Sequence, residues 1–215
     1  GQRCSALRVL CLQDDVADHT LKMLRGAMAE CRMGNPGRLT TDIGPVIDAE
    51  AKANIENHIQ TMRAKGRPVF QAVRENSEDA REWQSGTFVA PTLIELDDFA
   101  ELHKEVFGPV LHVVRYNRNQ LPELIEQINA SGYGLTLGVH TRIDETIAQV
   151  TGSAHVGNLY VNRNMVGAVV GVQPFGGEGL SGTGPKAGGP LYLYRLLSSR
   201  PQDAVGVTFA RQDAE

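Results

Sequence analysis

Short apolar runs alternate with segments of helical period along most of this chain, and this alternation constrains the fold more than any other feature. Strand-like runs lie at residues 8–12, 69–73, 88–96, 110–116, 135–141 and 159–162, and helix-like segments lie at 16–31, 51–62, 121–128 and 144–152. Strands that alternate with helices are typical of α/β proteins, in which crossover helices join parallel strands. We therefore expect a largely parallel sheet with flanking helices.

Local signals mark the ends of the first two helices. Asp14 and Asp15 are good capping residues for the first helix, and the run Gly34-Asn35-Pro36-Gly37 stops it. The second helix is expected to start near Asp48 and to end at Gly66.

A long loop is expected over residues 163–190, where glycine dominates from residue 167 onward. Loops of this length in compact domains are usually functional, although a plain connection is the alternative. Within it, Val166-Gly167-Ala168-Val169 presents backbone N–H groups with little side-chain obstruction, and consecutive N–H groups can form a nest for a carboxylate. The run at 177–182 matches G-x-G-x-x-G, but the glycines and prolines after it exclude the helix that a dinucleotide fingerprint requires.

The composition argues against several classes of function. The net charge is -4, from 21 basic and 25 acidic residues, and no basic stripe is present that could bind a nucleic acid. The most apolar stretch, residues 166–172, is too short and too rich in glycine to span a bilayer. The 3 cysteines and 6 histidines are scattered, so we expect neither a disulfide framework nor a metal site, and a reducing cytoplasm fits best.

Cys4 is the candidate nucleophile. Its neighbours are polar or charged, whereas Cys11 and Cys31 lie on apolar faces, where a buried structural role is usual. Thiolates are favoured beside cations and at helix N-termini, and Arg3 is adjacent while Ser5 could open a helical turn. The surroundings of Cys4 therefore favour a reactive thiol.

Glu105 and Phe107 lie just before the strand-like run at 110–116. A carboxylate can accept hydrogen bonds from both hydroxyls of a ribose, and an aromatic ring can lie beside a flat heterocycle. Taken alone, a solvated glutamate and a core phenylalanine would be the more common interpretation.

Several runs of the chain occur in the order of a known enzyme family. They are Gly1-Gln2-Arg3-Cys4, Glu105-Val106-Phe107-Gly108-Pro109, Gly134-Leu135-Thr136-Leu137-Gly138-Val139, Gly157-Asn158-Leu159-Tyr160-Val161-Asn162 and Pro174-Phe175-Gly176-Gly177. Together they resemble the aldehyde dehydrogenase superfamily over residues 1–197. A narrower similarity, at residues 162–177 and 188–194, is to the dehydrogenase module of proline utilisation A, a family of bifunctional bacterial enzymes of proline catabolism.

The resemblance implies a catalytic role for Cys4 and a cofactor role for two other residues. The Cys4 thiol would attack an aldehyde to give a thiohemiacetal, and loss of hydride to NAD would give a thioester that water hydrolyses. The backbone N–H of Cys4 would help to hold the oxyanion. Glu105 would hold the nicotinamide ribose, and Phe107 would pack near the nicotinamide.

The substrate implied by the resemblance is L-glutamate γ-semialdehyde, an aldehyde that carries a carboxylate and is oxidised to L-glutamate. Ser5, Gly167 and Ala168 would anchor the carboxylate, and Phe175 would flank the aliphatic chain. This assignment agrees with the nest of bare N–H groups expected from the residues themselves.

Much of the enzyme would lie outside this chain. In the family, the NAD-binding domain, the glutamate base for deacylation and the asparagine of the oxyanion hole precede the cysteine, so we expect the isolated chain to be inactive. Residues 1–197 would form the catalytic domain, and 198–215 a tail whose apolar alternation at 205–209 could add an oligomerisation strand. FAD would belong to the absent proline dehydrogenase part. We expect a homo-oligomer in the bacterial cytoplasm.

Two other functions fit parts of the pattern. A cysteine hydrolase or acyltransferase would need a histidine within hydrogen-bond reach of Cys4. A non-catalytic assembly module would form dimers with Cys4 far from any cleft. A dehydrogenase would instead gather Glu105, Phe175 and Gly167 around Cys4.

Overall fold

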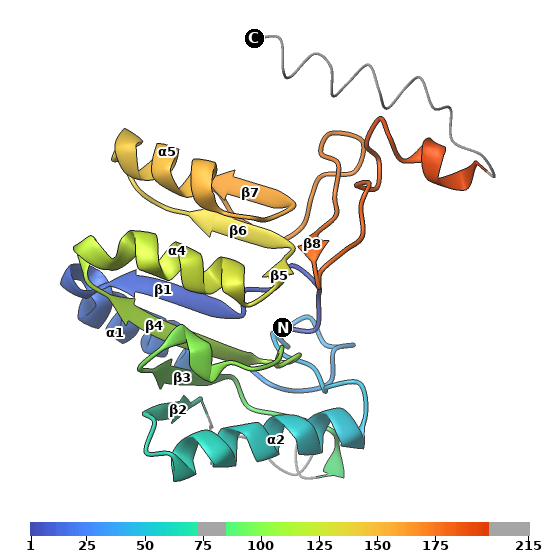
Figure 1. Cartoon of the computed structure of the whole chain (residues 1–215). Coiled ribbons are helices and arrows are strands. Elements are labelled where there is room, and N and C mark those ends of the chain that lie inside the picture. Colours follow the sequence, from blue (N-terminus) through green and yellow to red (C-terminus); the bar gives the residue numbers. More distant parts are fainter. Residues whose placement is uncertain (73–84, 198–215) are drawn as a thin grey trace, which may run out of the picture.

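A four-stranded sheet forms the first part of the computed structural model, which describes residues 1–72 and 85–197 (Figure 1). Its strand order is β1 (Val9–Gln13), β4 (Val110–Tyr116), β3 (Thr92–Leu96) and β2 (Val69–Gln71). The first three are parallel neighbours, and β2 is an antiparallel edge strand. The expected α/β fold with a mostly parallel sheet is confirmed.

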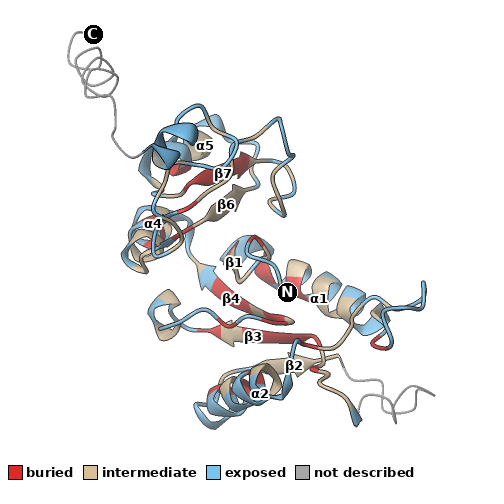
Figure 2. Cartoon of the chain, turned by 90° about the vertical axis from the view of Figure 1, so that its right-hand side faces the viewer, coloured by how far each residue is buried: buried red, intermediate tan, exposed pale blue. Residues whose placement is uncertain are grey.

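Helices cover both faces of this sheet, α1 (Asp14–Glu30) on one and α2 (Ala49–Ala64) on the other. Because successive strand residues point to opposite faces, Leu93 and Val113 pack with α1 while Ile94 and Val114 pack with α2. In Figure 2, much of β3 and β4 is coloured as buried. Each such aliphatic side chain contributes about 1.5–3 kcal/mol by leaving water.

The ends of α2 agree with the sequence, whereas the start of α1 does not. The Asp48 side chain accepts a hydrogen bond from the Ala51 N–H at 2.7 Å, and Gly66 ends the helix with φ of 79°. Asp14 and Asp15 were expected to cap α1, but both lie inside its first turn, and Gln13 occupies the N-cap without a side-chain capping hydrogen bond. The reason is that β1 runs directly into α1, so the two carboxylates lie in the first turn, where negative charge favours the helix dipole.

The strand expected over 88–96 begins only at Thr92. Pro91 stands immediately before it and has no N–H to donate to a neighbouring strand. The strand expected over 69–73 is observed as β2 as far as Gln71, and its last residue lies outside the described residues.

A second unit follows β4 and lies beyond β1, on the side of the sheet away from β2 (Figures 1 and 2). It contains α4 (Leu121–Ala130), β6 (Thr136–Val139), α5 (Asp144–Ser153) and β7 (Asn158–Val161). Strands β6 and β7 are parallel and joined through α5, as the alternating pattern predicted. Two short strands, β5 (Tyr133–Gly134) and β8 (Glu178–Gly179), pair antiparallel and attach the glycine-rich segment to this unit.

Turns, rather than an α-helix, follow β8, so the G-x-G-x-x-G match at 177–182 does not form a dinucleotide fingerprint. Three short 3₁₀ helices complete the described elements: η1 (Phe99–Glu101), η2 (Arg118–Gln120) and η3 (Leu193–Leu196). The edge strand expected at 205–209 lies outside the described residues. Within 1–72 and 85–197, no helix is both long and apolar enough to cross a membrane.

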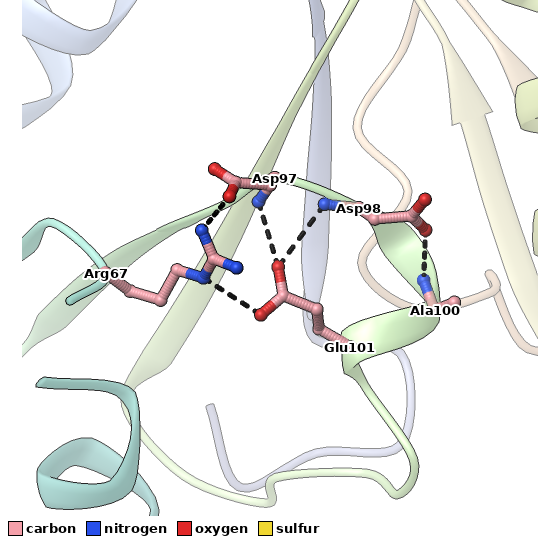
Figure 3. A network of polar contacts seen from close by, with 5 residues as sticks. All are labelled: Arg67, Asp97, Asp98, Ala100 and Glu101. Atoms are coloured by element: carbon pink, nitrogen blue, oxygen red, sulfur yellow. Dashed lines mark hydrogen bonds and ion pairs between the residues drawn. The ribbon is translucent and has the colours of Figure 1, made fainter. Parts of the chain in front are cut away.

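A polar network braces the connection from β3 to β4 (Figure 3). Arg67 pairs with Asp97 and donates from Nε to Glu101 Oε2 at 2.9 Å, and the Asp98 side chain accepts from the Ala100 N–H at 2.7 Å. Glu101 Oε1 also accepts from the backbone N–H of Asp97 at 3.0 Å. This network joins Arg67, just before β2, to the residues that directly follow β3.

Candidate active site

Cys4 lies in a tight turn immediately before β1. The turn is closed by a hydrogen bond of 3.1 Å from the Ala6 N–H to the Arg3 carbonyl, and the Cys4 side chain is exposed. Cys11 instead packs against the core, where burial raises the pKa of its thiol to about 12. Cys11 therefore stays protonated, and Cys4 is the most exposed of the three free cysteines.

Glu105 and Phe107 lie beside the Cys4 turn. The segments before β1 and β4 meet at one edge because these strands are parallel neighbours. The Arg8 guanidinium joins them: Nε donates to Glu105 Oε1 at 2.9 Å, and the central carbon lies 4.5 Å from the centre of the Phe107 ring. The side chains of Glu105 and Phe107 are both exposed.

The backbones of the two segments also touch. A Cβ at Gly1 would lie 1.8 Å from the carbonyl oxygen of Gly108, a separation that no side chain can adopt. Glycine at position 1 therefore permits the thiol-bearing segment to lie directly on the segment that leads into β4.

The glycine-rich segment reaches the same turn. The Gly167 N–H donates to Ser5 Oγ at 2.9 Å, although the two residues are 162 positions apart, and Ser5 is 6% exposed. Gly167 has φ of 78°, in the left-handed region that favours glycine. Ala168 follows directly and is half-buried. Residues from the two ends of the described chain thus meet at Ser5.

Phe175 is held by a different set of contacts. Its backbone N–H donates to the Ala187 carbonyl at 2.9 Å and its carbonyl accepts from the Ala187 N–H at 2.8 Å. The buried Asn158 amide donates to the Pro174 carbonyl at 2.9 Å and accepts from the Gly176 N–H at 3.2 Å. The backbone hydrogen bonds of Phe175 therefore tie it to its own segment and to the start of β7 rather than to the Cys4 turn.

Two histidines near this edge form a pair with each other. His58 Nε2 and His112 Nε2 are 2.8 Å apart, and His112 Nδ1 lies 3.3 Å from the Arg8 carbonyl oxygen. Burial, together with the nearby His58, lowers the pKa of His112 to about 4. In the described ranges no histidine nitrogen forms a hydrogen bond with the Cys4 thiol, and no group of three metal-ligating side chains gathers there.

Sequence reasoning missed Arg8 and Asn158 as residues that build this site. A weak signal existed for Arg8, a charged residue set between apolar neighbours at the start of a strand-like run. Asn158 belongs to one of the runs that resemble the known family. Nothing in the local sequence indicates that its amide binds the backbone of a loop further along the chain.

The sequence matches the aldehyde dehydrogenase family over residues 1–200. The chain belongs to this family. It is 94% identical over all of its 215 residues to the bifunctional protein PutA of Escherichia coli strain K12, of which it covers 16%. This chain therefore spans about a sixth of the length of that relative.

Solved structures agree with this aldehyde dehydrogenase fold. A mutant of proline utilisation A from Bradyrhizobium japonicum superposes with a TM-score of 0.81 at 51% identity, over 89% of this chain and 19% of that one. A 1-pyrroline-5-carboxylate dehydrogenase from Thermus with bound NAD superposes with a TM-score of 0.77 at 36% identity, over 90% of this chain and 36% of that one.

Proposed function

We propose that residues 1–197 form the thiol-bearing catalytic domain of an NAD-dependent dehydrogenase that oxidises L-glutamate γ-semialdehyde to L-glutamate within a longer polypeptide. The observation that carries this proposal is the hydrogen bond from Gly167 to Ser5, which joins the glycine-rich segment to the turn that contains the exposed Cys4. The names of the relatives, PutA and 1-pyrroline-5-carboxylate dehydrogenase, support the same substrate.

Cys4 is the proposed nucleophile. Its sulfur attacks the aldehyde carbon to form a thiohemiacetal, and the carbonyl oxygen becomes an oxyanion. The backbone N–H of Cys4 forms none of the hydrogen bonds among the described residues, so it is available to hold this oxyanion. One well-placed donor of this kind contributes about 3 kcal/mol to transition-state stabilisation.

The substrate carboxylate is proposed to dock at Ser5 and Ala168. Ser5 Oγ accepts the Gly167 N–H, and this leaves the hydroxyl proton of Ser5 free to be donated to an anion. The Ala168 N–H is a second donor that no described acceptor occupies. Gly167 therefore orients Ser5, and Phe175 is proposed to flank the aliphatic part of the substrate.

The residues fit one end of NAD. Glu105 gives one carboxylate oxygen to Arg8 and keeps the other for a ribose hydroxyl, while Phe107 offers an exposed ring. When bound, NAD supplies a hydride acceptor for the substrate carbon. A cradle for its pyrophosphate is absent from the described residues, and we propose that the rest of the polypeptide supplies it together with the deacylation base and any FAD-dependent proline dehydrogenase part.

The competing functions receive less support. A cysteine hydrolase requires a base on the thiol, yet His58 and His112 are bonded to each other, and no hydrogen bond among the described residues joins a histidine to the Cys4 thiol. A homo-oligomer in the bacterial cytoplasm remains part of the proposal, supported by three cysteines that are all free and by exposed apolar residues in 166–197.

The test is to replace Cys4 in the full-length polypeptide. The unmodified protein is expected to form NADH from glutamate semialdehyde, and Cys4→Ala is expected to lower kcat by a factor on the order of 10³ or more. Cys31→Ala is the matched control, because this thiol lies at the end of α1, and its turnover should stay near the original rate. NADH formation that survives Cys4→Ala would refute the proposed nucleophile.

A further inference from the structure

We infer that Arg8 is a positioning residue that locks the thiol-bearing turn to the cofactor-facing pair Glu105 and Phe107. The inference rests on the proposed function, because it assigns Arg8 a task in the reaction of Cys4. Arg8 itself need not touch the substrate or NAD.

The Arg8 guanidinium contacts both of the segments that lead into β1 and β4. Its Nε donates to Glu105 at 2.9 Å, Nη1 donates to the Gly1 carbonyl at 2.5 Å, and Nη2 donates to the Arg3 carbonyl at 2.9 Å. The central carbon of the group lies over the Phe107 ring, 4.5 Å from its centre. One side chain thus bonds to backbone groups before Cys4 and to both proposed cofactor residues.

The backbone of Arg8 is also anchored by hydrogen bonds. The Arg8 carbonyl accepts hydrogen bonds from the backbone N–H of His112 at 3.0 Å and faces His112 Nδ1 at 3.3 Å. His112 is 2% exposed and lies in β4. Because Arg8 is anchored to the sheet at one end, its guanidinium fixes the two segments relative to the sheet and not merely to each other.

Only arginine can make this set of contacts. A guanidinium is planar and carries donors in a rigid fork that point to several acceptors at once, and it stacks on an aromatic face. A lysine ammonium is a point charge at the end of a flexible stem. The Arg8 side chain is 17% exposed, and its loss would remove the donors that pair with the Gly1 and Arg3 carbonyls.

Because Arg8 fixes the two segments, it should also fix the distance between the reacting groups that they carry. Hydride transfer requires a fixed distance between the substrate carbon bound to the Cys4 sulfur and the nicotinamide. An error of about 1 Å in this distance costs on the order of 100-fold in rate. We therefore expect Arg8 to control how well bound NAD covers the thiol.

The test compares Arg8→Lys with Arg67→Lys in the full-length polypeptide. Arg67 also bridges two carboxylates, but its network follows the end of β3 (Figure 3), whereas Cys4 precedes the start of β1 in the same set of parallel strands. The readout is the NAD concentration that half-protects Cys4 from alkylation by iodoacetamide, measured without substrate. We expect Arg8→Lys to raise this concentration by about tenfold or more and Arg67→Lys by less than about twofold. A value for Arg8→Lys within about twofold of the unmodified protein, with the thermal midpoint retained, overturns the inference.

A double-mutant cycle covers the case in which Arg8→Lys loses stability. If Arg8 acts through Glu105, the effects of Arg8→Lys and Glu105→Gln on NAD protection are strongly non-additive, whereas additive effects would contradict the inference. The two proposals fail differently. An unmodified protein that makes no NADH from the semialdehyde removes the proposed function, whereas an active protein that is indifferent to Arg8→Lys removes only the role of Arg8.

Discussion

At the scale of single residues, this site depends on polar side chains that form hydrogen bonds with backbone groups. Arg8 binds two carbonyls before the thiol, Ser5 accepts the Gly167 N–H, and the Asn158 amide binds on both sides of Phe175. In each case a polar side chain fixes a loop that has few apolar contacts of its own. Loss of such a side chain leaves backbone groups unpaired, which costs more than the net gain of a hydrogen bond.

Asn158→Leu tests this principle away from the thiol. The change keeps the side-chain volume but leaves the Pro174 carbonyl and the Gly176 N–H without partners, so the free energy of unfolding should fall by about 1–3 kcal/mol. Because the 174–176 turn carries Phe175, the KM for the semialdehyde in the full-length polypeptide should also rise.

The matched control for this substitution is Asn129→Leu. Asn129 likewise donates to the Ser153 carbonyl and accepts from the His155 N–H, each at 2.8 Å, but it joins α4 to the end of α5. Its loss should lower stability and leave the KM unchanged. An equal rise in KM for both variants would show that only general destabilisation is at work.

At the scale of elements, α2 and β4 are linked through the His58–His112 pair as well as through aliphatic packing. Only one of two ring nitrogens 2.8 Å apart can carry the shared proton, so the pair opposes double protonation. Burial lowers the pKa of both imidazoles, and Lys104 and Lys65 lower that of His58 further. Arg8 adds positive charge on the side of His112.

A pH dependence of stability follows from this pair. The unfolded chain binds protons at these histidines near pH 6.5, whereas folded His112 does so only near pH 4. Stability is thus fully present above about pH 6.5 and is lost as the pH falls toward 4, by about 1–2 kcal/mol between about pH 7 and pH 5. Urea unfolding at a series of pH values should show this slope.

His112→Gln provides the comparison for that measurement. It should flatten the slope in this range, whereas His140→Gln, at an exposed position, should leave it as it is. A slope that persists unchanged in His112→Gln would assign the pH dependence to other groups.

At the scale of the whole molecule, the second unit ends in an apolar and exposed segment. Val170, Val172, Leu193 and Leu196 are 97%, 72%, 72% and 73% exposed. Neighbouring large apolar side chains that remain in contact with water favour association. The same segment contains Gly167 and Phe175, so whatever covers it also borders the proposed substrate site.

The isolated chain of 215 residues is therefore expected to self-associate. Sedimentation velocity should show species larger than a monomer whose amount grows with concentration. The double variant Leu193→Ser with Leu196→Ser should shift the distribution toward monomer, because it removes much of the exposed apolar surface. A monodisperse monomer of the unmodified chain at all concentrations would contradict this expectation.

The amino-acid sequence by itself determined the features that depend on near neighbours. The alternation of strands and helices, the Asp48 cap and the Gly66 stop follow from side-chain period and local hydrogen bonds, and they were predictable. The ordered motifs likewise pointed to the family that the comparison confirms. The caps assigned to Asp14 and Asp15 were wrong because a strand joins the helix without a loop, a tertiary arrangement that local preference does not encode.

Only the tertiary structure decided which chemistry-bearing residues meet. Ser5 and Gly167 are 162 residues apart, and Arg8 and Glu105 are 97 apart, so no local pattern relates them. They come together because parallel β1 and β4 bring the segments before them to one edge, and because the glycine-rich segment folds back onto the Cys4 turn. Hydrogen bonds between distant loops depend on the elements that bring both loops together, and for this reason the roles of Arg8 and Asn158 are visible only in the folded chain.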